Sequence, residues 1–457
     1  MADRVAPPRK LFGTDGIRGV ANQEPVTAET ALRVGRALGH LCRRDGAGRP
    51  RVVVGKDTRL SGDMLEAALA AGLCSVGVDV LLAGVLPTPA VAFLTRDLQA
   101  GAGVVISASH NAFQDNGIKC FAASGFKLPD EVEQDIEQMV LHAGEDFRAD
   151  AGELGRTMHL GDAADRYAAF VTCAFPRELT LAGLKIVVDC ANGATFRVGP
   201  QILQALGATV TAIGVSPDGT NINRNCGAVH PQQLQQTVRA RGAHVGFALD
   251  GDGDRLMLVD ESGEVVDGDE VLAMVGAEML RHGTLKHATV VATVMSNVGL
   301  EVALRERGAR LVRVQVGDRY VVEEMRRHGY NFGGEQSGHV VLLDHSTTGD
   351  GLIAALAVLR LMVERGRPLS ELKRVMAKFP QALINVPVQR RRDLAAIAPV
   401  QQTIERIAGT LGERGRVLVR YSGTEPLVRV MVEGEQPAQV RAYAEELAAA
   451  IRTHLTE

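Results

Sequence analysis

Three segments of this chain repeat one order of features: an apolar strand, a polar or glycine-containing turn, an amphipathic helix, a glycine after the helix, and a second apolar strand. The first strands of the repeats are predicted at 52–55, 186–189 and 290–294. The glycines predicted to end the helices are Gly72, Gly207 and Gly308. Repeated β-α-β units predict α/β domains. Such domains bind ligands at the carboxyl ends of their strands, so we expect the three strand-to-helix turns to face one cleft.

The pattern changes after Phe379-Pro380. Here the sequence predicts a strand near 382–388, a helix near 393–409, a hairpin over 416–432 and a helix near 437–453. This order indicates a smaller α+β domain. A chain of 457 residues is also longer than one core normally organises. The fold class predicted is therefore α/β, with three repeated α/β domains and a smaller C-terminal α+β domain around one central cleft. The predicted domains cover residues 1–158, 159–260, 261–376 and 377–457.

An acidic run lies directly after an apolar strand in the second repeat. Asp250, Asp252 and Asp254 are two residues apart and are separated by glycines. Alternate residues of an extended segment point the same way, and the glycines let the backbone bend, so we expect the three carboxylates to converge. Oxygen-only ligands suit a hard cation, which makes Mg²⁺ the predicted metal rather than zinc or copper.

The sequence argues against two other interpretations of this acidic run. An EF-hand loop also has Asp at positions 1, 3 and 5, and Glu261 falls at position 12, but position 6 is Arg255 where a glycine is needed. The next residues, 256–259, read as a second buried strand, so we reject the EF-hand. A solvated acidic turn would place three unneutralised carboxylates between two apolar strands, where they would repel one another.

Composition limits the kind of partner. The net charge of −4 gives no general attraction to nucleic acid or to an anionic membrane, so a small molecule is the expected partner. The N-terminus lacks the apolar core of a signal peptide, and no apolar run reaches the roughly 18 residues of a membrane span. The six cysteines form no C-x-x-C pair and no zinc-type cluster, which favours reduced thiols and a cytoplasmic location. The sequence leaves open whether the chain forms a homodimer.

Two segments near the N-terminus carry polar or basic groups suited to a ligand. A buried strand at 103–106 leads into Ser107–Asn111, and the stretch 115–119 adds a lysine to the same neighbourhood. The alternative is that these serines cap a following helix. The segment Gly13–Gly19 is a glycine-rich loop with Arg18, which suits a phosphate, although glycine-rich turns are common.

Two later segments complete the set. The predicted hairpin tip at 420–429 offers Ser422, Thr424, backbone N–H groups around Gly423, and an arginine on each strand, which together suit a phosphate dianion. An ordinary polar hairpin loop is the alternative. The segment 333–339 offers a carboxylate, a hydroxyl and an imidazole that suit sugar hydroxyls, although a lone histidine is usually structural.

Taken together, these motifs resemble the α-D-phosphohexomutase family. They are FGTDGIRG at 12–19, SASHN at 107–111, DGDGDR at 250–255, GGEQSGH at 333–339 and RYSGTEPLVRVM at 420–431. The resemblance implies four domains around one cleft, which agrees with the repeats, and an intramolecular phosphotransferase of the isomerase class. It places a phosphoserine loop, a metal loop, a sugar loop and a phosphate-binding loop in the four predicted domains, in that order.

The resemblance also implies roles for individual residues. Ser109 matches the phosphoserine, and the metal ligands would be Ser109, Asp250, Asp252 and Asp254. The other catalytic candidates are Lys119, Arg18, Arg255, His110 and His339. The substrate-binding candidates are Glu335 and Ser337 for the sugar, and Arg420, Ser422, Gly423, Thr424 and Arg429 for the distal phosphate. A phosphoserine beside three carboxylates would be repelled without a divalent ion, so the assignment is physically coherent.

The implied reaction consists of two phosphoryl transfers. Phosphorylated Ser109 gives its phosphoryl group to a hexosamine phosphate, the bisphosphate turns over in the cleft, and the other phosphoryl group returns to Ser109. Glucosamine 6-phosphate and glucosamine 1-phosphate are the expected pair, on the route to cell-wall precursors, with a bisphosphorylated sugar as primer. Mannose or glucose phosphates are the alternative substrates, and a non-catalytic sugar-phosphate sensor is the alternative of another class. The family usually has proline after SASHN, where this chain has Ala112, so the loop is expected to be less rigid.

Overall fold

The structure is a computed structural model of the chain, and it describes residues 11–13, 15–45, 48–142, 147–389, 392–422 and 426–455. The chain folds into two compact units. The first unit comprises Met1–Val294 and Val312–Lys373, and the second comprises Met295–Leu311 and Arg374–Glu457. Among the described residues, no helix has both the length and the apolar character that crossing a membrane requires.

The first sheet of the first unit is mixed. Its strands, in spatial order, are β1 (Phe12–Gly13), β2 (Gly16–Val20), β6 (Asp115–Ala122), β5 (Ala102–Ile106), β3 (Arg51–Lys56), β4 (Asp79–Val85) and β7 (Thr157–His159). The strands β3, β4 and β5 are parallel, whereas β6 runs antiparallel to both β5 and β2. The glycine-rich segment predicted as a loop is therefore largely strand, since residues 16–20 form β2 and pair with β6.

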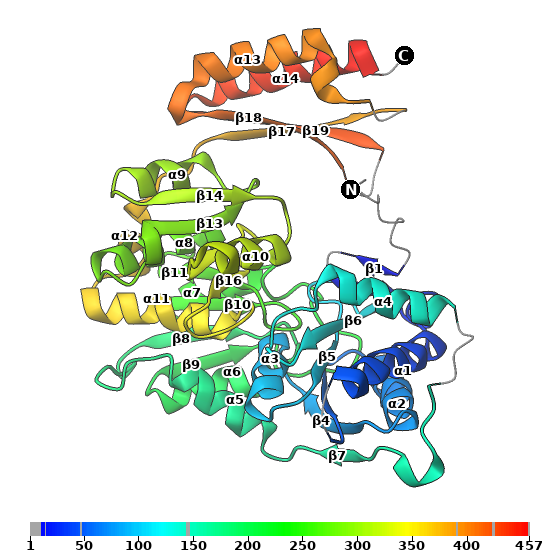
Figure 1. Cartoon of the computed structure of the whole chain (residues 1–457). Helices are drawn as coiled ribbons and strands as arrows, with labels where there is room; N and C mark the ends of the chain where they lie inside the picture. Colours follow the sequence, from blue (N-terminus) through cyan, green and yellow to red (C-terminus); the bar gives the residue numbers. More distant parts are fainter. Residues whose placement is uncertain are drawn as a thin grey trace. The chain divides into compact units, whose positions relative to one another are not determined.

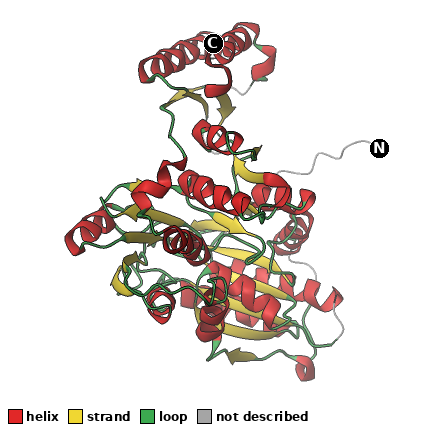
Figure 2. Cartoon of the chain, turned by 90° about the vertical axis from the view of Figure 1, so that its left-hand side faces the viewer, coloured by secondary structure: helices red, strands yellow, loops and turns green. Residues whose placement is uncertain are grey.

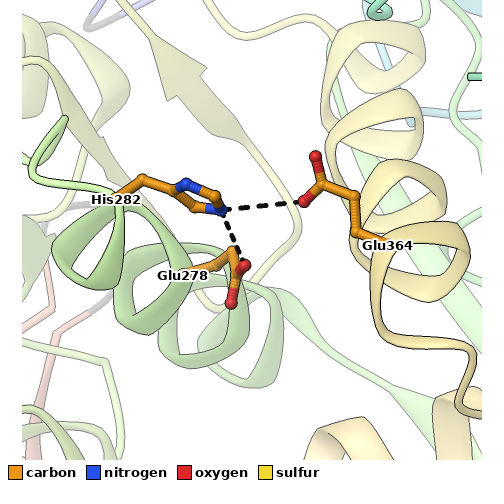
Figure 3. Close-up of side chains that lie close together, drawn as sticks. All are labelled: Glu278, His282 and Glu364. Atoms are coloured by element: carbon orange, nitrogen blue, oxygen red, sulfur yellow. Dashed lines mark hydrogen bonds and ion pairs between the residues drawn. The ribbon is translucent and has the colours of Figure 1, made fainter. Parts of the chain in front are cut away.

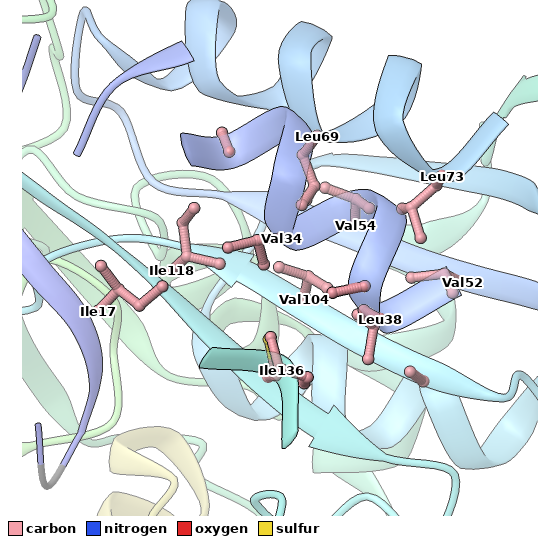
Figure 4. Packing of buried hydrophobic residues seen from close by; sticks show 14 of the residues in the cluster. Ile17, Val34, Leu38, Val52, Val54, Leu69, Leu73, Val104, Ile118 and Ile136 are labelled. Carbon is pink, nitrogen blue, oxygen red and sulfur yellow. The ribbon is translucent and has the colours of Figure 1, made fainter. Parts of the chain in front are cut away.

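Helices cover both faces of this sheet. The helices α1 (Ala28–Asp45), α2 (Gly62–Ser75) and α4 (Asp130–Leu141) pack against one face, where Val52 and Val54 of β3 join Leu38 and Leu69 in a buried cluster (Figure 4). Alternate residues of a strand point to opposite faces. Gly55 and Gly103 therefore face α3 (Thr88–Asp97), and a Cβ on either would lie within 3.4 Å of the side chain of Val91, so these glycines let α3 pack closely.

One helix end was predicted incorrectly. Helix α2 continues through Gly72 to Ser75, and the chain turns at Gly77, whose φ is +81°. Gly72 instead faces α1, because a Cβ on it would lie 2.2 Å from the backbone oxygen of Leu32. Gly35 of α1 has the reciprocal position, with 2.4 Å to the backbone oxygen of Leu69. These two glycines bring the helices together rather than ending one of them.

The other two repeats form the second and third sheets (Figure 1). The second sheet has the order β12 (Val265–Val266), β11 (Leu256–Asp260), β10 (Val245–Leu249), β8 (Lys185–Asp189) and β9 (Thr209–Ile213). The third has the order β14 (Arg310–Val314), β13 (Thr289–Thr293), β15 (Phe332–Gly334) and β16 (Val340–Leu342). The predicted strand-helix-strand orders are confirmed, and Gly207 and Gly308 follow their helices with φ of +97° and +84°.

The helices of this part of the chain are α5 (Ala163–Thr172), α6 (Val198–Ala205), α7 (Gln232–Arg241), α8 (Gly268–Arg281), α9 (Val298–Arg305), α10 (Asp318–His328), α11 (Gly351–Arg365) and α12 (Leu369–Leu372). Short 3₁₀ turns lie at η1 (Ala151–Glu153), η2 (Lys286–Ala288) and η3 (Lys373–Val375). Helix α8 begins with a capping box, in which Asp267 accepts from the backbone of Glu270 and the side chain of Glu270 accepts from the backbone of Asp267.

The second unit contains an antiparallel sheet of three strands. They are β17 (Gln381–Pro387), β19 (Leu427–Glu433) and β18 (Arg416–Tyr421), with β19 in the centre. Helices α13 (Ala398–Leu411) and α14 (Pro437–Leu455) cover one face, as Figure 2 shows, and the turns η4 (Leu394–Ala396) and η5 (Gly412–Arg414) flank α13. The core between sheet and helices includes Val386, Val428, Ile407 and Leu447. The predicted α+β domain is confirmed.

Four sheets thus correspond to the four predicted domains, and the fold class of three α/β domains followed by a smaller α+β domain is confirmed. The domain limits at residues 158, 260 and 376 stay predictions.

Candidate active site

The serine loop connects β5 to β6, so a strand follows it rather than a helix, and the helix-capping alternative is wrong. Ser109 is buried and has a φ of +53°, a left-handed conformation that is uncommon for a residue with a side chain. Its N–H donates to Ser107 Oγ at 2.9 Å. Its own hydroxyl donates to Asp250 Oδ2 at 2.5 Å, which joins the serine loop to the acidic loop 141 residues away.

Two buried side chains hold the unusual backbone of this loop. Arg59 Nη2 donates to the carbonyl oxygens of Ser109 and Asn111, both at 2.9 Å. Asn223 Nδ2 donates to the same two oxygens, at 2.8 and 2.9 Å. Arg59 is itself paired with the buried Asp57, at 2.8 Å. Side chains of two predicted domains therefore hold the loop through its backbone oxygens. The effect of Ala112 on the rigidity of the loop stays a prediction.

The acidic loop differs from the prediction in its backbone. The antiparallel strands β10 and β11 flank it, and residues 250–255 form a turn rather than an extended segment, so the predicted reason for convergence was wrong. The carboxylates nevertheless converge: one oxygen of each of Asp250, Asp252 and Asp254 lies within 4.8 Å of the others. Their exposures are 0%, 0% and 5%, which excludes the solvated acidic turn. A strand follows the loop, as expected when the EF-hand was rejected.

The strand-to-helix turns of the first two repeats support these loops instead of carrying them. The first turn supplies Asp57 and Arg59, described above, and Thr58 Oγ1 donates to the backbone oxygen of Asn192 at 2.6 Å. The second turn supplies the N–H of Ala194, which donates to the backbone oxygen of Gly251 at 2.7 Å. The turns of these two repeats therefore contact the backbone around the serine and acidic loops.

The carboxylate oxygens of the acidic triad differ in the hydrogen bonds that they accept. Asp250 accepts from the Ser109 hydroxyl and, at 3.1 Å, from the backbone N–H of Arg255. Asp252 Oδ1 is buried and has no hydrogen-bond partner among the described residues. Burial, and then the charges of Asp254 and Asp252, raise the pKa of Asp250 well above its ordinary value. A bound cation would remove this repulsion, so the residues fit a hard metal ion.

Cationic side chains lie around the triad. Lys119 Nζ is 2.7 Å from Asp252 Oδ2, 3.5 Å from Asp254 Oδ2 and 3.3 Å from Asp15 Oδ2. Burial opposes its charge, but these three carboxylates outweigh burial and raise the pKa of Lys119. Arg18 pairs with Asp15, and Arg255 Nε lies 4.0 Å from Asp254 Oδ1. All three predicted cations are thus near the acidic loop or linked to it.

The two predicted histidines have different surroundings. His110 Nδ1 is 3.3 Å from Ser109 Oγ, and burial, with Arg255 and Arg18, lowers the pKa of His110 to about 4. His339 is buried, with Nδ1 3.7 Å from Asp254 Oδ1 and Nε2 3.6 Å from Asp318 Oδ2. His110 therefore contacts the Ser109 hydroxyl, whereas His339 lies close to the carboxylates of Asp254 and Asp318.

Sequence reasoning missed a buried charge network beside the triad. Lys127 Nζ is 2.6 Å from Asp318 Oδ2 and also pairs with Asp15. Arg319 pairs with the buried Glu133 at 2.6 Å. Asp15 lies in the motif at 12–19. Lys127, Asp318 and Arg319 lie in none of the five motifs, and only their ion-pair partners indicate that they belong to this network.

The predicted sugar loop is the connection between β15 and β16. Glu335 is buried, and its Oε1 accepts from the backbone N–H of Gly317 at 3.1 Å. Ser337 Oγ lies 3.4 Å from Glu335 Oε2. The loop at 316–320 therefore orients the carboxylate that was predicted to contact the sugar.

The predicted phosphate loop lies in the second unit, at the end of the hairpin formed by β18 and β19. Arg420 and Arg429 lie on the two strands of the hairpin, as predicted, and the register places them directly opposite each other. Burial and the charge of Arg429 lower the pKa of Arg420. Ser422 is buried, and Gly423 and Thr424 lie outside the described residues. Two like charges at directly opposite positions repel, so an anion bound by both would be favourable.

A second cluster with metal-ligand chemistry lies between α8 and α11 (Figure 3). His282 Nε2 is 2.9 Å from Glu278 Oε1 and 3.8 Å from Glu364 Oε2. Glu278, however, pairs with Arg281 and Arg365 at 2.5 and 2.6 Å. Glu364 pairs with Arg360 at 2.8 Å. Three arginines therefore offset the two carboxylates, and the acidic triad is the better candidate for a cation.

Comparison with known proteins identifies the family. Four family models, described as domains I, II and III (alpha/beta/alpha) and the C-terminal domain of phosphoglucomutase/phosphomannomutase, match residues 9–146, 165–263, 267–379 and 383–450. The chain belongs to the phosphoglucomutase/phosphomannomutase family. The predicted phosphohexomutase, an enzyme of the isomerase class, is confirmed.

Individual relatives show which members of the family the chain is similar to. A phosphoglucosamine mutase of Anaeromyxobacter sp. (strain Fw109-5) is 57% identical, and the match covers 98% of this chain and 96% of the relative. A phosphoglucosamine mutase of Syntrophotalea carbinolica is 53% identical, with 98% of each chain covered. Among solved structures, a phosphoglucomutase/phosphomannomutase family protein from Burkholderia thailandensis is 25% identical, covers 97% of this chain and 99% of its own, and has a TM-score of 0.80.

Proposed function

We propose that this enzyme interconverts glucosamine 6-phosphate and glucosamine 1-phosphate through a phosphorylated Ser109 and a bisphosphate intermediate. The observation that carries the proposal is the Ser109 hydroxyl, 2.5 Å from Asp250 in a buried acidic triad. The relatives named phosphoglucosamine mutase support the choice of the amino sugar.

The proposed metal is Mg²⁺, held by Asp250, Asp252, Asp254 and an oxygen of phosphorylated Ser109. The donor set is oxygen only, and the buried Asp252 Oδ1 accepts no hydrogen bond from the described residues. When bound, the ion neutralises charge on the phosphoryl group during transfer.

In the first transfer, the bond between phosphorus and Ser109 Oγ breaks and a bond forms from phosphorus to the free hydroxyl of the sugar. The proton of the sugar hydroxyl passes to a base, and Ser109 Oγ, which leaves with the electron pair of the broken bond, takes up a proton and becomes the serine hydroxyl again. His110 Nδ1, 3.3 Å from Ser109 Oγ, is the candidate for moving a proton at this oxygen. Lys119, Arg18 and Arg255 would bind the phosphoryl oxygens, and His339 would orient Asp254. The second transfer runs in the opposite sense and returns a phosphoryl group to Ser109. A bisphosphorylated sugar would prime the unphosphorylated enzyme.

We expect a higher kcat/KM for glucosamine 1-phosphate than for glucose or mannose 1-phosphate, because the buried Glu335 carboxylate can pair with the amine of the sugar. Steady-state assays with each sugar phosphate, Mg²⁺ and bisphosphate primer test this. Glu335→Gln should reduce the preference, since it keeps the shape and removes the charge. A higher kcat/KM for mannose 1-phosphate would favour the alternative substrates. Absence of turnover with all three, and of phosphate on the protein, would favour the sensor.

We expect Arg429→Ala and Arg420→Ala each to lower kcat/KM about tenfold to a hundredfold in both directions. Each removes one charge-assisted hydrogen bond to the non-reacting phosphate, worth roughly 1.5–3 kcal/mol. Kinetics in both directions, with release of the bisphosphate measured, test the loss. The control is Arg414→Ala, because Arg414 is half exposed and pairs with Glu435 at 2.6 Å in the same unit. Unchanged kinetics in both test variants would refute the phosphate role.

We further propose that the enzyme acts in the cytoplasm on a small sugar phosphate. All six cysteines lie in the part of the chain that the structure describes, and they are free thiols, which suits a reducing compartment.

A further inference from the structure

Thr88 links the domain of the first sheet to the acidic loop, which belongs to the domain of the second sheet. It is the first residue of α3 and is fully buried. Its hydroxyl donates to Asp252 Oδ2 at 2.5 Å, and its backbone N–H donates to the carbonyl oxygen of Asp252 at 2.8 Å. The residue before it, Pro87, is the N-cap of α3, and the cap makes no side-chain hydrogen bond. The Thr88 hydroxyl is therefore directed at the acidic loop and not used to cap its own helix.

This contact fixes the orientation of the Asp252 carboxylate, with one oxygen bound by donors and the other, among the described residues, free. Oδ2 accepts from both Thr88 Oγ1 and Lys119 Nζ, the latter at 2.7 Å. Oδ1 is buried without a hydrogen-bond partner among the described residues. A quarter-turn of the carboxylate about its Cβ–Cγ bond would break both hydrogen bonds and turn the free oxygen away from its present position.

We propose that Thr88 is a positioning residue for the metal site: its hydroxyl holds Asp252 so that Oδ1 is presented to the cation. This inference rests on the metal site of the proposed function. A hydrogen bond that orients a metal-ligating carboxylate contributes to metal affinity without touching the metal.

Lys119 cannot hold the carboxylate in the same way. Its ammonium group is shared among Asp252, Asp254 and Asp15, on a long flexible side chain. Thr88 is β-branched and therefore stiff at χ1, and it sits on a helix packed against β3 and β5. Without the Thr88 hydroxyl, Asp252 keeps one shared donor on Oδ2 and can rotate.

The test is direct binding of Mn²⁺, followed by electron paramagnetic resonance or calorimetry on the full chain, for wild type, Thr88→Val and Thr88→Ser. Mn²⁺ is the probe because it accepts the same oxygen ligands as Mg²⁺. We expect Thr88→Val to weaken binding about tenfold to a hundredfold. Thr88→Ser, which keeps the hydroxyl, should bind close to wild type. The Mg²⁺ concentration for half-maximal rate should rise in Thr88→Val while the KM for the sugar phosphate stays unchanged.

A matched control lies on the same helix. Thr95 is also fully buried, and its hydroxyl donates to the backbone oxygen of Val91 at 2.7 Å, within α3. Thr95→Val makes the same chemical change without touching the acidic loop, so Mn²⁺ binding should not change. If Thr88→Val does not fold, as judged by circular dichroism, Thr88→Ala removes the hydroxyl without adding a methyl group.

Unchanged Mn²⁺ affinity in folded Thr88→Val or Thr88→Ala would overturn the role of Thr88 and leave the metal site standing. An equal loss in Thr95→Val would overturn it too, because the effect would then come from α3 in general. If wild type binds no Mn²⁺, or if Asp252→Asn binds it equally well, the metal site itself fails together with this inference.

Discussion

Replacing Ser109 by alanine should remove nearly all mutase activity, a loss of roughly a thousandfold or more in kcat, because Ser109 carries the phosphoryl group in the proposed mechanism. The hydroxyl is buried beside Asp250, and the loop around it is held by Arg59 and Asn223 through backbone oxygens. Those contacts do not involve the hydroxyl, so Ser109→Ala should fold normally. Steady-state assays and peptide mass spectrometry of the wild type, which should carry phosphate on Ser109 in part of the molecules, test this.

Ser107 provides the matched control. It lies in the same loop, and its hydroxyl donates to Asp57 Oδ2 at 2.5 Å and accepts from the Ser109 N–H. Ser107→Ala removes a hydroxyl of equal size but leaves the phosphoryl acceptor, so phosphate should persist on Ser109 and the loss of rate should be much smaller. Phosphate found only on another residue, with an active Ser109→Ala, would end the assignment.

Features with a short sequence period could be predicted well. The three repeats follow from apolar strands and helices a few residues apart, and the triad follows from Asp250, Asp252 and Asp254 in one loop. The repeats follow from backbone periodicity and the triad from the close spacing of its residues in one loop, so both are visible in one sequence. The paired arginines of the second unit are visible for the same reason, since Arg420 and Arg429 flank one hairpin.

The supporting residues could not be predicted, because each acts on a partner far away in the chain. Thr88 contacts Asp252, Arg59 contacts Ser109, and Lys127 contacts Asp318, over separations of 164, 50 and 191 residues. None belongs to a local pattern that marks it. Gly72 was misread for a related reason: a glycine near a helix end looks like a stop, and only the opposing backbone of α1 explains it.

The loops that carry Ser109 and the acidic triad are not strand-to-helix turns, and this has a physical cause. In a purely parallel sheet the strand-to-helix turns are the ligand sites. Here β6 and β11 return antiparallel beside β5 and β10, so the serine and acidic loops are connections between strands. The serine loop and the acidic loop meet at the ends of these strands, where Ser109 Oγ lies 2.5 Å from Asp250 Oδ2.

Removing the metal, or one of its ligands, should have the second large effect. Asp252→Asn should lower kcat a hundredfold or more, because in the proposed metal site it removes a charged ligand. This loss should exceed the tenfold to hundredfold effect expected when only a residue that orients a ligand is changed. Chelation of wild type should abolish activity and leave the circular dichroism spectrum unchanged. A buried apolar cluster of the first sheet's domain, formed by residues such as Leu38, Leu69 and Val54, includes none of the proposed metal ligands.

Glu278→Gln separates the two acidic clusters of the first unit. Glu278 belongs to the cluster with His282 and Glu364, where Arg281 and Arg365 already balance its charge. If the acidic triad is the metal site, Glu278→Gln should keep the wild-type Mg²⁺ dependence while Asp252→Asn loses it. The reverse pattern would move the metal to the cluster between α8 and α11. An Asp252→Asn enzyme with unchanged rate and Mg²⁺ dependence would show that the convergence of three buried carboxylates serves something other than a cation.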